Sequence, residues 1–259
     1  GETPTLSEEE WLRVVRITAE VAHGRVPIVA GATSNSTSEA VRKARALAAV
    51  PGVDAILTAA PYYNKPTQEG QYQHFRAMAE ALSSQGSDKP IVLYNVPGRT
   101  GANLEPATVA RLAAIPNIIA IKEASGSSAQ IAEVVTVTPE DFQVLSGDDA
   151  ATLGLIGAGG VGLISVASNA IPAEMSAMVR AALNNDWSTA RALQRKFLPL
   201  IQALFIESNP MPVKAALAMM GRMEESYRLP MCPMKPENRA KLEKVCNAVG
   251  LLAGATARA

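Results

Sequence analysis

The chain has 259 residues, 48% of them hydrophobic and 19% charged, and its 24 basic and 24 acidic residues give a net charge of zero. This balance, with no basic block, gives no electrostatic reason to expect a nucleic acid or a membrane surface as partner. Two cysteines, two isolated histidines and the lack of a long apolar run argue against a disulfide framework, a zinc site and a membrane span, so we expect a cytoplasmic enzyme.

The first residues predict a loop that runs directly into a helix. Ser7 is the expected N-cap, and Glu8, Glu9 and Glu10 complement the helix dipole in the first turn. A domain rarely begins in this way, and we therefore expect that further polypeptide precedes Gly1 in the complete protein.

Short apolar runs then alternate with longer helical patterns, which predicts repeated right-handed βαβ units and a parallel sheet. The predicted strands are Pro27–Gly31, Ala55–Ala60, Pro90–Asn95, Ile118–Lys122, Gln143–Ser146 and Gly162–Ala167. The predicted helices among them are Glu8–Val21, Ser38–Ala49, Gln68–Ser83, Pro106–Ala114, Ser128–Val135 and Asp149–Gly157. Only helical patterns follow, at Ala173–Asn184, Trp187–Phe205, Pro212–Met220 and Pro236–Val249. A closed barrel needs eight strands whereas an open doubly wound sheet can have six, so the strand count alone leaves both architectures open.

Lys122 is the sharpest functional candidate, because it follows the apolar run Ile118–Ile121 where a parallel strand leaves the core. A partly desolvated amine has a lowered pKa and is a nucleophile suited to forming an imine with a carbonyl compound. A lysine that merely extends from a strand end, or that pairs with Glu123, is an equally good interpretation of its position alone.

Two further strand-end residues are weaker candidates by themselves. The phenol of Tyr94 could relay protons to a carbonyl oxygen, although strand tyrosines are more often core residues. The guanidinium of Arg99, in a Pro-Gly-Arg-Thr-Gly turn, could clamp a carboxylate, although an exposed loop arginine is the commoner case.

Two other patterns do not indicate a cofactor. The glycine-rich segment Gly157–Gly162 follows a helix and enters a strand, the reverse of a dinucleotide-binding loop, so it predicts a tight turn. Asp148 and Asp149 lack a nearby phosphate loop, and we expect them to cap the following helix rather than to bind magnesium.

In combination and in this order, the motifs resemble the dihydrodipicolinate synthase / N-acetylneuraminate lyase family. The resemblance rests on Tyr62–Pro66, Leu93–Gly101, Ile121–Gly126, Leu145–Asp149, Ile164–Asn169 and Glu207–Lys214, and thus covers essentially the whole chain. It implies the fold of a (β/α)₈ TIM barrel, N-terminally incomplete in residues 1–184, with a C-terminal helical subdomain in residues 185–259, assembled as a homotetramer (a dimer of dimers).

The resemblance also implies a reaction that needs no metal and no organic cofactor. Lys122 would form a Schiff base with pyruvate, which then condenses with L-aspartate 4-semialdehyde on the pathway to diaminopimelate and lysine. Tyr94 would transfer protons, helped by Tyr63 from a neighbouring subunit, and Arg99 would hold the carboxylate of the aldehyde. Gly147 and Ile164 match backbone positions beside the imine.

The sequence departs from the family pattern at its start. The family's first strand, first helix and second strand have no counterpart here, nor do the two threonines that precede the position of Gly1. We therefore interpret the chain as a fragment or an incomplete record of a full enzyme.

A regulatory lysine site is a second implication of the resemblance. The matching positions are Glu8, Trp11, Asn35, Glu39 and Tyr62. Trp11 stands where the family usually has histidine or glutamate, and an indole offers no charge to a ligand. We therefore predict weak or absent feedback inhibition by lysine.

Three alternatives remain beside this interpretation. Another pyruvate-dependent aldolase of the family, acting on sialic acid or a keto-sugar acid, is disfavoured by Arg99, which sialic-acid lyases typically lack. A non-catalytic, ligand-binding family member is disfavoured by the joint presence of Lys122, Tyr94 and Arg99. A nucleotide-binding oxidoreductase lacks a correctly placed glycine motif.

Overall fold

The computed structural model describes residues 2–252. The chain forms two compact units, which are described one at a time. Ser7–Gly147 and Gly154–Leu163 make up the first, called the sheet unit below. The second, called the helical unit, contains Asp148–Leu153, the chain from Ile164 onward and the short segment before Ser7.

The sheet unit is built on six parallel strands that are hydrogen-bonded in sequence order. The strands are β1 (Val29–Gly31), β2 (Ala55–Ala59), β3 (Ile91–Asn95), β4 (Ile118–Glu123), β5 (Gln143–Ser146) and β6 (Gly162–Leu163). Since every strand runs in the same direction, the carboxyl ends of all six lie at one edge of the sheet. That edge is where α/β proteins place their functional groups.

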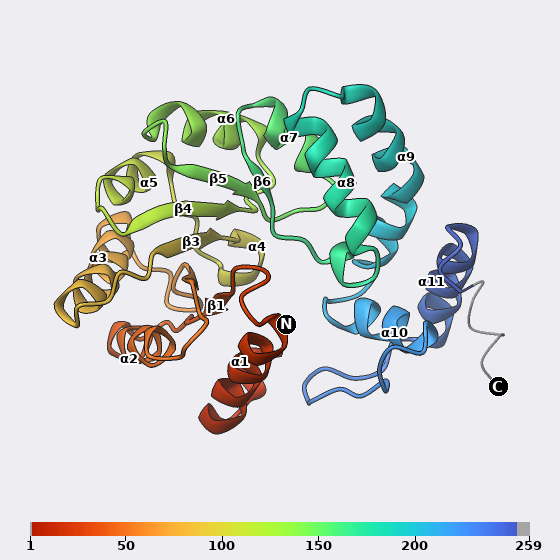
Figure 1. Cartoon of the computed structure of the whole chain (residues 1–259), viewed down its shortest axis with the longest axis horizontal. Coiled ribbons are helices and arrows are strands. Elements are labelled where there is room, and N and C mark those ends of the chain that lie inside the picture. The colour runs from red at the N-terminus through yellow and green to blue at the C-terminus, as the bar shows by residue number, and fades with distance from the viewer. Residues whose placement is uncertain (1, 253–259) are drawn as a thin grey trace. The chain divides into compact units, whose positions relative to one another are not determined.

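The helices of the sheet unit are amphipathic elements that cover the strands. They are α1 (Glu8–Ala22), α2 (Thr37–Ala48), α3 (Gln68–Ser84), α4 (Pro97–Thr100), α5 (Pro106–Ala113) and α6 (Ser128–Val137), followed by α7 (Thr152–Gly157), whose first residues belong to the helical unit. In Figure 1, α2, α3, α5 and α6 succeed one another along the outside of the strands. The predicted cap at Ser7 is confirmed, since its hydroxyl accepts from the N–H of Glu10 and the Glu10 carboxylate accepts from the N–H of Ser7.

The helical unit contains four longer helices and two short 3₁₀ turns in its described residues. These are η1 (Thr3–Thr5), η2 (Ala167–Asn169), α8 (Pro172–Leu183), α9 (Trp187–Ala203), α10 (Met211–Met219) and α11 (Pro236–Ala248). Glu2, just before η1, accepts hydrogen bonds from the Lys214 amine on α10 and from the backbone N–H of Arg228. The bonds from Arg228 and Lys214 lower the pKa of the Glu2 carboxyl. They also hold the segment around Glu2 in the helical unit.

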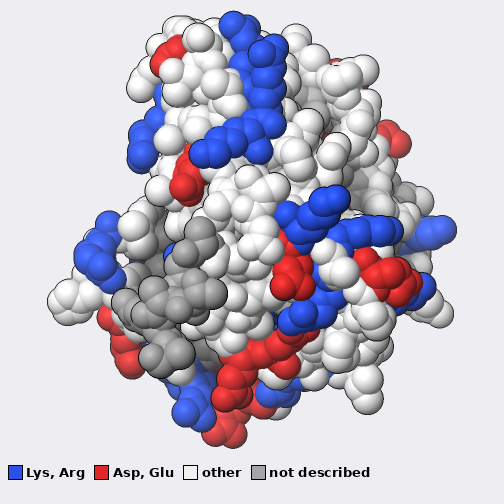
Figure 2. All heavy atoms as spheres, turned by 90° about the vertical axis from the view of Figure 1, so that its right-hand side faces the viewer, with Lys and Arg blue, Asp and Glu red and all other residues white. Residues whose placement is uncertain are grey.

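The surface agrees with the balanced charge of the sequence. The face in Figure 2 carries both basic and acidic side chains, so charge of a single sign does not cover it. Among residues 2–252, no helix is both long and apolar enough to cross a membrane.

The last predicted strand is wrong beyond Leu163. The carboxylate of Asp149, fully buried, accepts from the Ser165 hydroxyl and from the backbone N–H groups of Val166 and Ala167 at 3.0 and 3.2 Å. These donors are therefore engaged away from the sheet ladder, and the chain turns into η2. The Asp148 carboxylate accepts from the N–H of Ala150 at 2.8 Å, in the turn that precedes α7, and Asp149 does not cap the helix.

Two predicted turns can also be compared with the structure. The turn predicted around Arg99 is the short helix α4, which ends at Gly101 in the left-handed conformation. The glycine segment between α7 and β6 forms the tight turn that was predicted. Its backbone is closely packed, since a Cβ on Gly160 would lie 2.0 Å from Leu155 Cδ2 and 2.9 Å from the carbonyl oxygen of Val144.

His74 makes the stability of the sheet unit sensitive to acid. Its side chain is 3% exposed, its Nδ1 lies 3.0 Å from the hydroxyl of Thr37, and burial lowers its pKa from 6.5 to about 4. The folded state therefore favours the neutral ring, so the stabilisation is complete above pH 6.5 and is lost as the pH falls from 6.5 toward 4. We expect about 2.5 kcal/mol of unfolding free energy to be lost from this group by pH 4.5.

Urea unfolding at pH 8 and pH 4.5 measures this loss. His74→Phe should show a smaller difference between the two pH values than the parent chain. His23→Gln, which changes the exposed histidine at the end of α1, is the matched control and should behave like the parent. Equal pH dependence of the His74→Phe variant and the parent would contradict the assignment.

Candidate active site

Lys122 and Tyr94 are neighbours at the carboxyl edge of the sheet. They are register partners on the adjacent parallel strands β4 and β3, so their side chains project from the same face. The Nζ of Lys122 lies 4.2 Å from the centre of the Tyr94 ring, within the range of cation–π attraction. Both side chains are half-buried, so the amine is partly screened from water and still accessible.

The sheet face below this pair is apolar. Val92 and Ala120 lie two residues earlier on β3 and β4 and form a small cluster with Ala55, Leu57 and Leu145. Burial raises the pKa of the Tyr94 phenol above its usual value, and the nearby charge of Arg99 opposes that shift. The phenol is therefore a neutral proton donor at physiological pH.

Gly147 follows β5 and lies beside the lysine side chain. A Cβ at this position would lie 2.8 Å from Ala124 Cβ and 3.0 Å from Lys122 Cε. The Gly147 N–H donates to the carbonyl oxygen of Glu123 at 2.8 Å, which fixes the backbone in place. Only glycine leaves room for the observed position of the lysine stem.

Replacing Gly147 by alanine should therefore displace Lys122. We expect the imine formation that was predicted for Lys122 to slow by about 10²-fold, the usual effect of misplacing a reacting group by about 1 Å. The rate of borohydride-trapped adduct formation measures the change. Gly154→Ala is the control, because a Cβ there meets nothing within 4 Å. An equal trapping rate in both variants would contradict this packing argument.

Arg99 lies on α4 and Tyr63 on the loop after β2, and a backbone hydrogen bond links these two segments. The backbone N–H of Tyr63 donates to the carbonyl oxygen of Thr100 at 3.1 Å, next to exposed Arg99 on α4. Lys65 packs its stem on Gly101, where a Cβ would lie 3.1 Å from Lys65 Cε. Tyr63 has a φ of 73° and its side chain is 86% exposed. A non-glycine residue in this conformation costs free energy and is typical of functional segments.

Ile164 belongs to the helical unit. It is the first residue after β6 and is half-buried. The three residues that follow it are those held by the Asp149 carboxylate. Asp149 therefore fixes the backbone that continues from Ile164.

The residues of the predicted lysine site lie around α1 and α2. Arg42, which the sequence analysis did not single out, contacts both Glu8 and Glu39 in salt bridges. Trp11 is 6% exposed and donates from Nε1 to the carbonyl oxygen of Gly31 at 3.2 Å, so its ring packs inside the sheet unit. Asn35 is half-buried and Tyr62 is 41% exposed.

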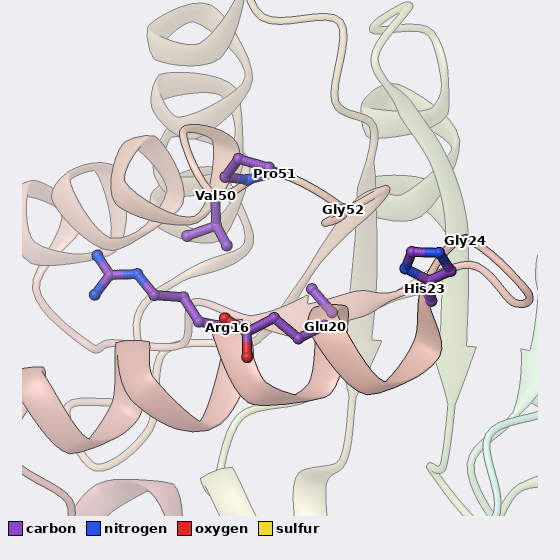
Figure 3. Close-up of a pocket in the computed structure, with 8 residues that line it drawn as sticks. Arg16, Glu20, His23, Gly24, Val50, Pro51 and Gly52 are labelled. Atoms are coloured by element: carbon purple, nitrogen blue, oxygen red, sulfur yellow. The ribbon is translucent and has the colours of Figure 1, made fainter.

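A surface hollow of about 470 Å³ lies away from these residues, between the end of α1 and the turn before β2. Figure 3 shows Arg16, Glu20 and His23 along α1, facing the turn at Val50–Gly52. This turn precedes its strand and thus lies at the amino edge of the parallel sheet, opposite to Lys122. Its mixed charges and open shape give no reason to place the chemistry there.

Sequence reasoning missed a buried polar cluster next to Tyr94 and Lys122. Asn95 and Glu123 are 0% and 1% exposed and are register partners one residue beyond Tyr94 and Lys122. The signal that could have found them is a polar residue at the same position after the apolar run of each strand. Within residues 2–252, no group of three or more His, Cys, Asp or Glu side chains could hold a metal ion.

Comparison with known proteins gives a consistent result. The sequence model of the Dihydrodipicolinate synthetase family matches residues 1–249. A protein of Koribacter versatilis named 4-hydroxy-tetrahydrodipicolinate synthase is 70% identical over 256 residues, covering 99% of this chain and 84% of that protein. One of the same name from Acidobacterium capsulatum is 60% identical over 253 residues, covering 97% of this chain and 82% of that protein.

A solved structure extends the likeness to the fold. Dihydrodipicolinate synthase from Thermotoga maritima is 42% identical, covers 97% of this chain and 85% of its own, and superimposes with a TM-score of 0.93. With a family match along nearly its whole length, this chain belongs to the dihydrodipicolinate synthetase family.

Proposed function

We propose that the chain is a lyase that catalyses the 4-hydroxy-tetrahydrodipicolinate synthase reaction, the condensation of pyruvate with L-aspartate 4-semialdehyde in lysine and diaminopimelate biosynthesis. The observation that carries the proposal is the Lys122 amine, 4.2 Å from the centre of the Tyr94 ring at the carboxyl edge of a parallel sheet. The 70% identical relative of that name supports the choice of reaction.

The chemistry begins with the neutral amine of Lys122. It attacks the keto carbon of pyruvate, and loss of water leaves a protonated imine. A proton then leaves the methyl carbon to give an enamine, which adds to the aldehyde carbon of the second substrate. The substrate's own amine finally displaces Lys122, which closes the ring and restores the free lysine.

Other residues would bind or move protons in this sequence. The Tyr94 phenol donates to the oxygen that leaves as water and recovers a proton when the enamine forms. Arg99 binds the carboxylate of the aldehyde through a bidentate pair. Gly147 supplies a backbone group beside the imine, Ile164 keeps the backbone role predicted for it from the sequence, and exposed Tyr63 serves the site of a neighbouring subunit.

The complete architecture is part of the proposal. Residues 1–184 supply six strands of a (β/α)₈ barrel, residues 185–259 make up a helical subdomain, of which 253–259 lie outside the described residues, and the enzyme is a cytoplasmic homotetramer. Feedback by lysine is weak, because Arg42 already occupies the carboxylates of Glu8 and Glu39 and Trp11 is turned inward. Strong inhibition by millimolar lysine would refute this last point.

Reductive trapping tests the proposed reaction. The protein is incubated with pyruvate, borohydride is added, and the intact mass and the modified peptide are measured. We expect one pyruvate adduct on Lys122, and product formation when aspartate semialdehyde is supplied instead of borohydride. An adduct with turnover of N-acetylmannosamine alone would indicate the sialic-acid branch of the family, and the lack of any adduct would overturn the imine chemistry.

A further inference from the structure

A buried polar cluster lies on the sheet face opposite to the Tyr94 and Lys122 side chains. Asn95 and Glu123 follow those two residues on β3 and β4 and are register partners in their turn. Because side chains alternate along a strand, this second pair projects from the other face. The neighbours below it, Leu93 and Ile121, are fully buried, so Asn95 and Glu123 continue a buried face.

Both oxygens of the Glu123 carboxylate are occupied. Oε2 accepts from Nδ2 of Asn95 at 3.1 Å, and Oε1 accepts from the backbone N–H of Ser125 at 2.6 Å. The amide of Asn95 also donates to Oδ1 of Asn103 at 2.9 Å and accepts from the backbone N–H of Leu104 at 2.9 Å. One carboxylate and one amide thus join the ends of two strands to the segment after α4.

Asn103 extends this cluster to two helices. Its side chain exchanges hydrogen bonds with Gln130 on α6 at 2.9 and 3.1 Å. Its carbonyl oxygen accepts from Gln68 and Gln71 on α3 at 2.9 and 3.0 Å. A buried polar group left without its partner is destabilising, so a change in any member of the cluster is transmitted to its neighbours.

We propose that Glu123 is a positioning residue for the chemistry of Lys122. Through the Asn95 amide it fixes the end of β3 against the end of β4, and this sets the separation between the Tyr94 ring and the Lys122 amine on the other face. The inference rests on the proposed function, but it requires no contact between Glu123 and a substrate. A carboxylate is required because both of its oxygens face donors.

Glu123→Gln tests the role of this carboxylate. The substitution keeps the shape, but its NH₂ group must face either the Asn95 amide or the Ser125 N–H, and donor then meets donor. We expect kcat to fall by about 10- to 100-fold, as for other small misplacements of reacting groups. The trapping rate at saturating pyruvate should fall in parallel, while the KM for pyruvate stays near that of the parent.

Exchanging the carboxylate and the amide between positions 123 and 95 should restore part of the trapping rate. Such a restoration would not be expected if each single variant acted only by lowering stability. Asn95→Asp alone places two carboxylates together and should impair the trapping rate at least as strongly as Glu123→Gln. In the double variant Glu123→Gln/Asn95→Asp, the amide and the carboxylate face each other in the reverse order, and the Asn103 side-chain amide, whose Oδ1 accepts from Asn95 in the parent, turns to donate instead. We expect the double variant to trap pyruvate several-fold faster than the product of the two single effects predicts.

Val134→Ala, a truncation of a buried side chain on α6, is the stability-matched control. It should lower the melting temperature without lowering kcat. If the parent chain shows no Lys122 adduct, the proposed function fails. If the parent forms the adduct and Glu123→Gln traps pyruvate and turns over at the parental rate, or the exchanged pair shows no rescue, the positioning role is overturned.

Discussion

We expect Lys122→Met to abolish the borohydride-stable pyruvate adduct and to lower kcat by at least about 10³-fold, a loss typical of removing a covalent nucleophile. Methionine has nearly the length of lysine and is tolerated in apolar surroundings, so the stem can keep its place beside Gly147 and Tyr94. What disappears is the amine, without which no imine can form.

Lys122→Arg separates the role of charge from that of nucleophilicity. A guanidinium keeps the positive charge and can still contact the Tyr94 ring, but it remains protonated and does not form the imine. We expect this variant to be as inactive as Lys122→Met. Intact-mass measurement after trapping and a steady-state assay check both variants.

Lys241→Met, which changes an exposed lysine on α11, serves as the control and should retain the adduct. A pyruvate adduct on another lysine of the Lys122→Met chain, with turnover above a hundredth of the parent's, would show that the reaction does not depend on this amine.

The strand ends were accessible to sequence reasoning because their signal is local. A short apolar run that ends abruptly at a lysine predicts a buried strand that leaves the core, and β4 runs from Ile118 to Glu123 in agreement with this prediction. The helix bounds were equally accessible where a capping residue marks them, as Ser7 does for α1. The predicted and observed ends of β4 and α1 differ by one residue each.

The missed features depend on contacts between segments far apart in the sequence. Asp149 carries the same side chain whether it caps its own helix or binds the backbone of Val166, and only the folded chain decides between the two. Arg42 meets Glu8 across 34 positions, and no local pattern encodes that pairing. The alternation of faces explains why Lys122 and Glu123, adjacent in sequence, perform separate tasks.

Tyr94→Phe should lower kcat by about 10²–10³-fold and leave the KM for pyruvate nearly unchanged, as expected when a proton-transferring group is removed. The phenyl ring keeps the packing on Lys122 and the apolar face below it, so the binding of pyruvate is preserved. The lost hydroxyl removes the donor that assists the departure of water, and trapping with borohydride should therefore slow as turnover does.

The pH dependence of the rate provides a second test of the role of Tyr94. Burial raises the pKa of the Tyr94 phenol above its usual value, so its proton is present throughout the neutral and mildly alkaline range. Any alkaline decline of the parental rate that arises from loss of this proton should be absent from the Tyr94→Phe chain. Tyr72→Phe, on α3 where Arg111 stacks on the ring, is the matched control and should retain both rate and profile. If Tyr94→Phe also retained both, proton transfer would have to be assigned to another group, and the proximity of Tyr94 to Lys122 would reflect packing alone.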